Sequence, residues 1–265
     1  MLLAFGAIGL GIAVGRRSGL RSGVDATTWL WRTVLVGLVA ARLAYVWQWH
    51  DAYLRDPLGI LDVRDGGWDV AIGAAAAFVY ASTLVRRRPQ AKRPLLAAGI
   101  VTATIGVIGT IVLAFWPGSQ QAPRIPALEL RALDGRSVAL QQFTDRPLVL
   151  NLWATWCGPC RREMPVLQQA QASHPDVRFV FLNQGETAAQ VERFLHAENL
   201  VLDNVLLDPW QEAGKSFGRV ALPTTLFFDS NGRLVSSRVG ELSEATLEQR
   251  LRHQAAAEAR IRAQR

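Results

Sequence analysis

The sequence predicts a membrane α-helical domain of about four transmembrane helices, followed by an α/β domain. Four apolar stretches precede residue 117, and beyond it the chain changes to short apolar runs of strand length separated by turns and polar helical stretches. With 265 residues, of which 50% are apolar, the chain is long enough for two domains and too apolar to be intrinsically disordered.

The basic charge is concentrated in the apolar half. Residues 1–116 carry 12 basic and 6 acidic side chains, whereas residues 117–265 carry 17 and 16. Basic residues between apolar stretches are typical of loops beside a membrane. Because the second half is nearly neutral, we expect no nucleic-acid partner.

The predicted spans lie at about residues 2–15, 25–49, 69–85 and 95–116. Crossing the hydrocarbon core takes ~20 apolar residues, within a range of ~17 to 25. The first stretch is short for a full span, and whether it crosses the bilayer stays open. Arg16 and Arg17 follow this stretch rather than precede it, which is unlike a cleavable signal peptide.

Loop charges predict the topology, because Lys and Arg in short loops stay on the cytoplasmic side. The loop after the first stretch holds three arginines, and residues 86–94 (RRRPQAKRP) hold five basic residues and no acid. The loop at residues 50–68 holds four aspartates and two arginines. We therefore expect a multi-pass protein of a bacterial inner membrane, with the domain after Trp116 in the periplasm.

A resemblance covers roughly residues 30–80. The runs ARLAYV (41–46) and DPLGIL (56–61), followed by the pair Gly66-Gly67, resemble part of prolipoprotein diacylglyceryl transferase. In that family a catalytic histidine follows the glycine pair, whereas the aligned residue here is Ala71. The resemblance implies a related membrane domain without the transfer activity. Arg42, inside the second span, has either a function or a structural role as a buried ion pair or a snorkelling side chain.

The pattern of the second half predicts a linker at residues 117–126 and an α/β domain at residues 127–265. The pattern predicts a hairpin with an Asp134-Gly135 turn, and then a buried strand at residues 147–153 (PLVLNLW) that leads into a helix. Further elements are expected as strands at 177–182, 222–228 and 234–239, and as helices at 187–196 and from Ser243 to about His253. We expect the tail at residues 255–265 to be a solvated helix end.

Cys157 and Cys160 are the only cysteines, and they form a CxxC motif between the buried strand and its helix. At a helix start, unpaired backbone N–H groups and the helix dipole favour a thiolate. We expect Cys157 to be the solvent-exposed nucleophile and Cys160, more buried, to be the resolving thiol. Only four histidines accompany the pair, none at metal-ligand spacing, and Arg161 stands where covalent haem needs histidine, so neither zinc nor haem is expected.

The order strand, WCGPC, helix, strand, helix and Leu-Pro-Thr strand resembles the thioredoxin fold, and specifically the TlpA/ResA family of membrane-anchored thioredoxin-like reductases. The resemblance covers about residues 122–252. It implies a cis proline at Pro223 beside the CxxC motif, and substrate contacts from Trp156, Gly158, Pro159 and Pro223. It also implies that Glu163 assists proton movement at the dithiol, unless this residue is an ordinary solvent-facing glutamate. Asn151 stands where thioredoxin has a buried aspartate that carries a proton. Because asparagine cannot do so, this departure favours Glu163 as the proton carrier.

The resemblance implies a thiol-disulfide oxidoreductase with no cofactor beyond the Cys157–Cys160 disulfide. CGPC resembles thioredoxin, near ~−270 mV, more than the oxidant DsbA, near ~−120 mV, which favours a reductant of periplasmic protein disulfides. The chain carries no other electron source, so a DsbD-like membrane donor is implied. The alternatives are a disulfide oxidant or isomerase, a thiol-binding chaperone in cytochrome c or copper-site assembly, and a lipid-handling membrane domain regulated by the second half.

Overall fold

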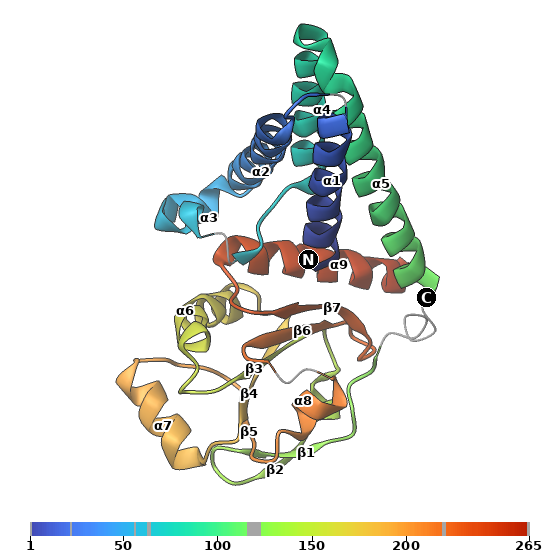
Figure 1. Cartoon of the computed structure of the whole chain (residues 1–265). Coiled ribbons are helices and arrows are strands. Elements are labelled where there is room, and N and C mark those ends of the chain that lie inside the picture. The colour runs from blue at the N-terminus through green and yellow to red at the C-terminus, as the bar shows by residue number, and fades with distance from the viewer. Residues whose placement is uncertain are drawn as a thin grey trace. The chain divides into compact units, whose positions relative to one another are not determined.

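The computed structural model describes residues 2–21, 23–55, 57–62, 65–115, 123–218 and 221–263. The chain forms two compact units (Figure 1). One comprises Met1–Asp51 and Gly67–Gln121, and the other comprises Ala52–Gly66 and Ala122–Arg265. The second unit therefore includes a segment that the sequence places between two apolar helices.

The first unit consists of long helices that pack in pairs. α1 (Leu2–Arg21) packs against α5 (Lys92–Phe115), and α2 (Thr27–Gln48) packs against α4 (Val70–Arg87). In the described residues of the chain's first half, the short helices include α3 (His50–Arg55), η1 (Pro57–Leu61) and η3 (Pro89–Ala91). The second pair approaches closely because a Cβ at Gly73 would lie 2.7 Å from the Cβ of Ala41.

Three helices of the described residues are long and apolar enough to cross a membrane: Thr27–Gln48, Val70–Arg87 and Pro89–Val112. They overlap the second, third and fourth predicted spans. The first predicted stretch is helical but runs beyond residue 15, through Arg16 and Arg17, to Arg21, and it is not among these three. The count of four spans therefore stays a prediction.

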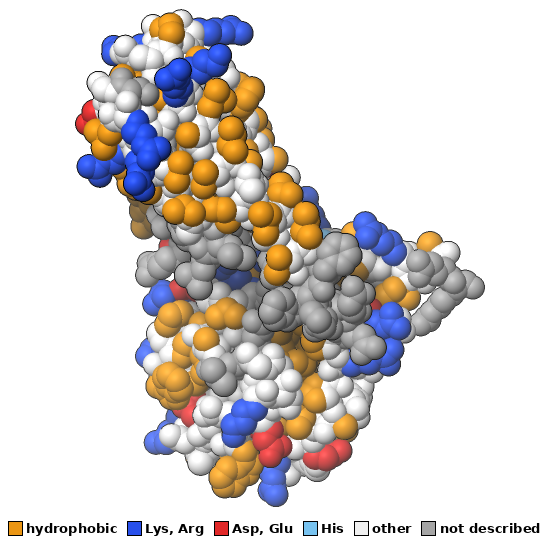
Figure 2. All heavy atoms as spheres, turned by 45° about the vertical axis from the view of Figure 1, so that its right-hand side comes forward, with side chains coloured by type: hydrophobic (Ala, Val, Ile, Leu, Met, Phe, Trp, Pro, Cys, Tyr) orange, Lys and Arg blue, Asp and Glu red, His pale blue; other side chains and the backbone are white. Residues whose placement is uncertain are grey.

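Apolar side chains cover much of the visible outer face of the helical unit, and Lys and Arg side chains gather at its upper end (Figure 2). The exposed apolar set includes Phe78, Val79, Ile100, Val107 and Ile108. A water-soluble surface rarely exposes large apolar patches. The pattern is the one expected of helices that face lipid.

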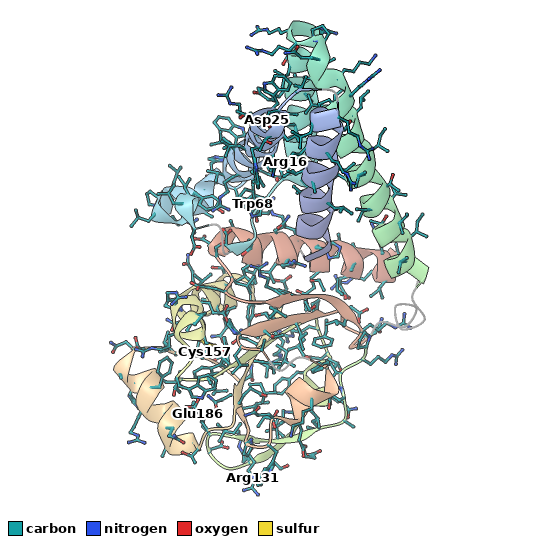
Figure 3. All side chains as sticks on the ribbon, in the orientation of Figure 1. Arg16, Asp25, Trp68, Arg131, Cys157 and Glu186 are labelled. Atoms are coloured by element: carbon teal, nitrogen blue, oxygen red, sulfur yellow. A yellow bond between two sulfur atoms is a disulfide. The ribbon has the colours of Figure 1, made fainter. Side chains whose placement is uncertain are left out.

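Arg42 is buried within the helical unit, with 7% of its surface exposed. Its Nη1 donates to the carbonyl of Gly67 at 2.8 Å, and its guanidinium lies 6.0 Å from the ring centre of Trp68, labelled in Figure 3. A Cβ at position 67 would lie 2.4 Å from the ring of Tyr45, so only glycine fits there. Arg42 thus holds the start of the segment that leads into α4.

The second unit is built on a seven-stranded sheet in the order β2-β1-β5-β4-β3-β6-β7. Its strands are β1 (Glu129–Ala132), β2 (Ser137–Ala139), β3 (Leu148–Trp153), β4 (Arg178–Gln184), β5 (Val205–Asp208), β6 (Thr224–Phe228) and β7 (Leu234–Val239). β3, β4 and β5 are parallel, and the other pairs are antiparallel. This is the α/β domain that the sequence predicts, with a thioredoxin-like order of elements.

Helices cover both faces of this sheet. They are α6 (Gly158–Ser173), α7 (Ala188–Ala197), α8 (Glu212–Ser216) and α9 (Glu244–Ala263). Val149 and Trp153 of β3 pack with residues of α6, α7 and α9, whereas Leu148, Leu150 and Leu152 pack on the other face with Ala213 of α8. Because both faces are covered, β3 is buried throughout and has the continuous apolar sequence of a central strand.

The prediction that the final helix ends near residue 253 is wrong, whereas the tail is a mostly solvated helix end, as expected, because of residues 255–263 only Glu258 is buried. α9 does not end near residue 253 but continues to Ala263, and Gln254 and Glu258 are 1% and 7% exposed. Gln254 Nε2 donates to the carbonyl of Phe228 at 2.7 Å, and Glu258 accepts from the Ser230 hydroxyl at 2.7 Å. Polar residues face inward here because they satisfy backbone groups where β6 ends. Of the predicted linker, residues 117–122 lie outside the described part.

Candidate active site

The CxxC motif lies where β3 passes into α6. Cys157 is the N-cap residue of α6, and its N–H donates to the carbonyl of Ala154 at 3.2 Å. Pro159 occupies the first turn, where a helix needs no backbone N–H group. The buried strand therefore delivers the first cysteine directly to the positive end of a 16-residue helix.

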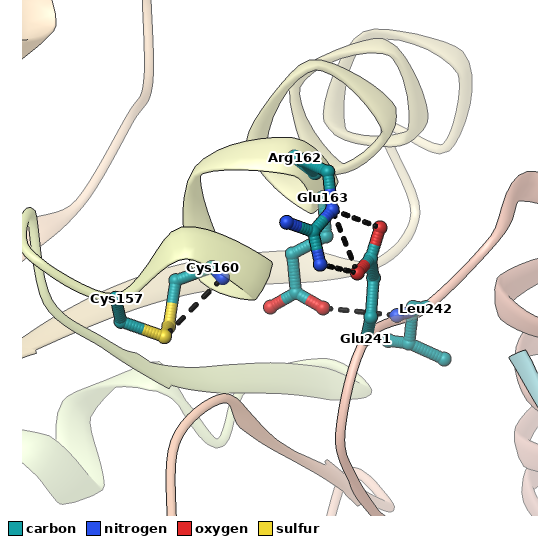
Figure 4. Close-up of polar contacts among 6 residues, drawn as sticks. All are labelled: Cys157, Cys160, Arg162, Glu163, Glu241 and Leu242. Carbon is teal, nitrogen blue, oxygen red and sulfur yellow. Dashed lines mark hydrogen bonds and ion pairs between the residues drawn. A yellow bond between two sulfur atoms is a disulfide. The ribbon is translucent and has the colours of Figure 1, made fainter. Parts of the chain in front are cut away.

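Cys157 and Cys160 form a disulfide with a Cα–Cα distance of 5.2 Å. The backbone N–H of Cys160 donates to Cys157 Sγ at 3.3 Å (Figure 4). The same contact would stabilise a thiolate at Cys157 after reduction. Cys160 is fully buried, and Cys157 is 5% exposed, so the expectation of a solvent-exposed Cys157 is wrong. The reason is that its side chain packs within the apolar cluster between α6 and the sheet.

The residues predicted to contact substrate divide by exposure. Trp156 is 69% exposed, and Gly158 and Pro159 are exposed beside it. Pro223 is buried, follows a cis peptide bond with Leu222, and accepts the N–H of Gly240 at its carbonyl at 2.9 Å. A flat exposed indole next to the disulfide is a surface on which a polypeptide can pack.

Glu163 lies one turn beyond Cys160 and is completely buried. Its two carboxyl oxygens accept from Asn151 Nδ2 at 2.8 Å and from the N–H of Leu242 at 3.0 Å. Figure 4 shows the bond from Leu242. Burial raises its pKa from 4.5 to about 8, against the lowering effect of these hydrogen bonds. Of the two expectations for this residue, the solvent-facing glutamate is wrong.

Asn151, in the middle of β3, joins the buried acid to the neighbouring strand. Its Nδ2 also donates to Thr225 Oγ1 on β6 at 3.0 Å. The amide is 1% exposed and cannot ionise. Glu163 is thus the ionisable member of this network, and Asn151 orients it.

Glu186 supports the cysteine loop in a way that the sequence analysis missed. At 7% exposure, its carboxylate accepts from the N–H of Thr155 at 2.7 Å, the hydroxyl of Thr155 at 2.5 Å and Asn183 Nδ2 at 2.7 Å. Figure 3 labels it with Cys157. Because Thr155 stands two residues before Cys157, this contact holds the loop that carries the nucleophile.

The described residues contain no group of three or more His, Cys, Asp or Glu side chains that could hold a metal ion. The chemical groups gathered at the site are instead a disulfide, a helix N-terminus and a buried acid whose pKa lies near neutrality. Such a set can exchange disulfide bonds and can supply or accept a proton near pH 8.

Comparisons with known proteins agree with this chemistry. The family model described as Redoxin matches residues 119–251. Thioredoxin-like protein YneN of Bacillus subtilis is 30% identical over 138 residues, which cover 51% of this chain and 80% of that protein. Thiol-disulfide oxidoreductase ResA of Bacillus thuringiensis is 30% identical, over 48% of this chain and 74% of that protein.

Another relative is the sporulation thiol-disulfide oxidoreductase A of Bacillus subtilis, which is 26% identical over 58% of this chain and 98% of its own length. Among solved structures, a thioredoxin family thiol:disulfide interchange protein from Chlorobium tepidum aligns with a TM-score of 0.45 and 23% identity. That alignment covers 52% of this chain and 97% of the other.

Proposed function

The chain belongs to the Redoxin family and is a thiol-disulfide oxidoreductase, and from this we propose that it reduces disulfide bonds of periplasmic proteins while its helical unit anchors it in the inner membrane. The observation that carries the proposal is the Cys157–Cys160 disulfide at the N-terminus of α6, with the buried Glu163 one turn away.

The reaction follows from the positions of the two sulfurs. In the reduced protein, the Cys157 thiolate attacks a substrate disulfide, forms a mixed disulfide and releases one substrate thiolate, which takes up a proton. Cys160 then loses its proton and attacks Cys157 Sγ, which restores the intramolecular disulfide and releases the second substrate thiolate. Two electrons pass from the dithiol to the substrate.

Glu163 is placed to handle the proton of the second step. A buried carboxyl whose pKa is about 8 is partly ionised near neutral pH, so it can accept the proton of Cys160 and return it to solvent. We propose it as the general base for the resolving thiol.

Turnover needs an electron donor outside the chain, because Cys157 and Cys160 are its only cysteines. A membrane reductase of the DsbD type would supply two electrons by thiol-disulfide exchange with the same pair. The three apolar helices and the basic loop at residues 86–94 support the membrane anchor and the periplasmic position of the redox domain.

Variants at the two cysteines test the mechanism. We expect Cys157→Ser to abolish reduction of a protein disulfide, and Cys160→Ser to accumulate mixed disulfides that a reductant releases. Full activity in either variant would contradict the mechanism. The double variant is the control for background exchange.

The reduction potential tests the direction of transfer. The full chain is equilibrated with glutathione or dithiothreitol buffers, and its thiols are counted by alkylation. A potential near or below about −250 mV supports a reductant. A value above about −150 mV favours an oxidant or isomerase and overturns the proposal.

A further inference from the structure

Residues 240–243 connect β7 to α9, whose first residue is Glu244. We call Glu241–Glu244 the β7–α9 turn. One side of this turn contacts the active-site helix. Glu241 forms a bidentate ion pair with Arg162, in which Nη2 donates to Oε2 at 2.6 Å and Nε donates to Oε1 at 3.1 Å. The N–H of Leu242 donates to Glu163 at 3.0 Å (Figure 4). Two consecutive residues of the turn thus bind two consecutive residues of α6.

The next two residues of the turn bind the segment Ala52–Gly66, which belongs to the same compact unit. The Ser243 hydroxyl donates to Asp65 Oδ2 at 3.2 Å, and Glu244 Oε1 lies 2.5 Å from Arg55 Nη1. Tyr53 Oη also donates to Asp65 Oδ2, at 2.9 Å. The segment therefore meets the turn through a buried carboxylate and an ion pair.

Asp65 is only 5% exposed, and a buried carboxylate is costly unless hydrogen bonds satisfy it. Its neighbour Gly66 has φ +71°, and a Cβ there would lie 2.5 Å from the Arg238 guanidinium. Asp65 thus contacts the turn through Ser243, and Gly66 lies against Arg238 of β7. Since Ser243 follows Leu242 directly, fixing the Ser243 hydroxyl also fixes the Leu242 N–H.

We propose that Asp65 is a positioning residue for the redox reaction: by binding the Ser243 hydroxyl, it holds the Leu242 N–H on the carboxyl group of Glu163. The proposal rests on the proposed function, because it assumes that Glu163 moves a proton for the dithiol. It assigns a part in that reaction to the segment between two apolar helices.

The proposal has a definite electrostatic consequence. Glu163 faces Asn151 of β3, the Leu242 N–H, Arg238 of β7 and Glu241 of the turn. Asn151, Leu242 and Arg238 favour its charged form, whereas burial and Glu241 favour the neutral form. If Asp65 no longer binds the Ser243 hydroxyl, the hydrogen bond from the Leu242 N–H to Glu163 weakens. The pKa of Glu163 should then rise further above its ordinary value.

The test uses the full chain and the pH dependence of a single turnover. The reduced protein is mixed with a small aromatic disulfide such as 5,5′-dithiobis(2-nitrobenzoate), and the resolving step is followed from pH 5 to pH 10. Glu163→Gln identifies the part of the profile that depends on Glu163. We expect Asp65→Ala to move the midpoint of that part upward by about half a pH unit or more.

Matched variants separate positioning from general damage. Asp65→Asn retains an oxygen that can accept both hydroxyls, so its midpoint should stay near that of the wild type. Tyr53→Phe should shift the midpoint upward by less than Asp65→Ala. Asp51→Ala makes the same change at a side chain that is 83% exposed, and it should shift nothing.

The outcomes are distinguishable. If the wild type and Glu163→Gln have the same profile, the proposed role of Glu163 fails and the inference fails with it. If they differ but Asp65→Ala keeps the wild-type midpoint, even with lowered stability, only the inference is overturned. Should Asp65→Ala not fold, an unshifted midpoint in Tyr53→Phe overturns it equally.

Discussion

Burial of Glu163 opposes the ionisation of its carboxyl group. Its pKa in the folded chain is about 8, against an ordinary value of 4.5. Between these pH values the folded protein retains a proton that the unfolded chain has lost. The contribution of Glu163 to the free energy of unfolding is therefore fully present below about pH 4.5 and is lost as the pH rises to about 8. Each pKa unit corresponds to about 1.4 kcal/mol.

We therefore predict that Glu163→Gln flattens the pH dependence of stability. The amide introduced by this substitution cannot ionise, so the wild type should lose stability between pH 5 and pH 8 while the variant does not. Urea-dependent proteolysis of the oxidised full chain at each pH measures this difference. Parallel slopes would mean that Glu163 titrates normally in the folded protein. Asp176→Asn, an exposed acid in the turn before β4, is the control.

The site residues differ in how far the sequence could predict them. Cys157 and Cys160 form a motif that can be read locally, whereas Pro223 and Glu163 were expected only because the sequence resembles the TlpA/ResA family. The burial of Glu163 was not readable, because it depends on Leu242, 79 residues away. Glu186 gave no signal either, since a glutamate after a strand is ordinary until its contact with Thr155, 31 residues away, is known.

At the scale of elements, the sequence predicts strands more reliably than the ends of helices. The seven-residue run of residues 147–153 contains all of β3 because a strand covered on both faces needs a continuous apolar sequence. α9 instead continues past Leu251, its last residue in the buried apolar cluster, through Gln254 and Glu258. Inward polar residues leave no hydrophobic periodicity, so the pattern could not show that Gln254 and Glu258 are buried.

This extension should matter for stability. Gln254 Nε2 donates to the carbonyls of Leu148 and Phe228, so Gln254→Ala leaves two backbone acceptors without this partner at the ends of β3 and β6. We expect a loss of about 1–3 kcal/mol in the free energy of unfolding. Urea-dependent proteolysis measures the loss, with His253→Ala, at an exposed neighbouring position, as the control. Equal stability of the two variants would show that α9 beyond Leu251 contributes little.

At the scale of the whole molecule, the sequence divides the chain by hydropathy, whereas the structure divides it by contacts. Hydropathy places everything before residue 117 in one domain. The compact units assign Ala52–Gly66 to the redox unit, because Asp65 and Arg55 bind residues of the β7–α9 turn. A loop between two apolar helices carries no sign of its partner in its sequence, so this assignment needed the three-dimensional structure.

The topology is the last prediction, and single cysteines in a Cys157→Ser, Cys160→Ser background can test it. Arg131→Cys lies on β1, Gln90→Cys lies in the basic loop, and Gly6→Cys lies near the start of α1. In intact cells, a membrane-impermeant maleimide should label position 131, whereas position 90 should react only after the membrane is opened. The reverse result would contradict a periplasmic redox domain, because loops rich in Lys and Arg stay in the cytoplasm.

Labelling at position 6 then decides the number of spans. Labelling from outside means that α1 crosses the membrane as the fourth span, and labelling only after opening leaves the three helices that are long and apolar enough by themselves.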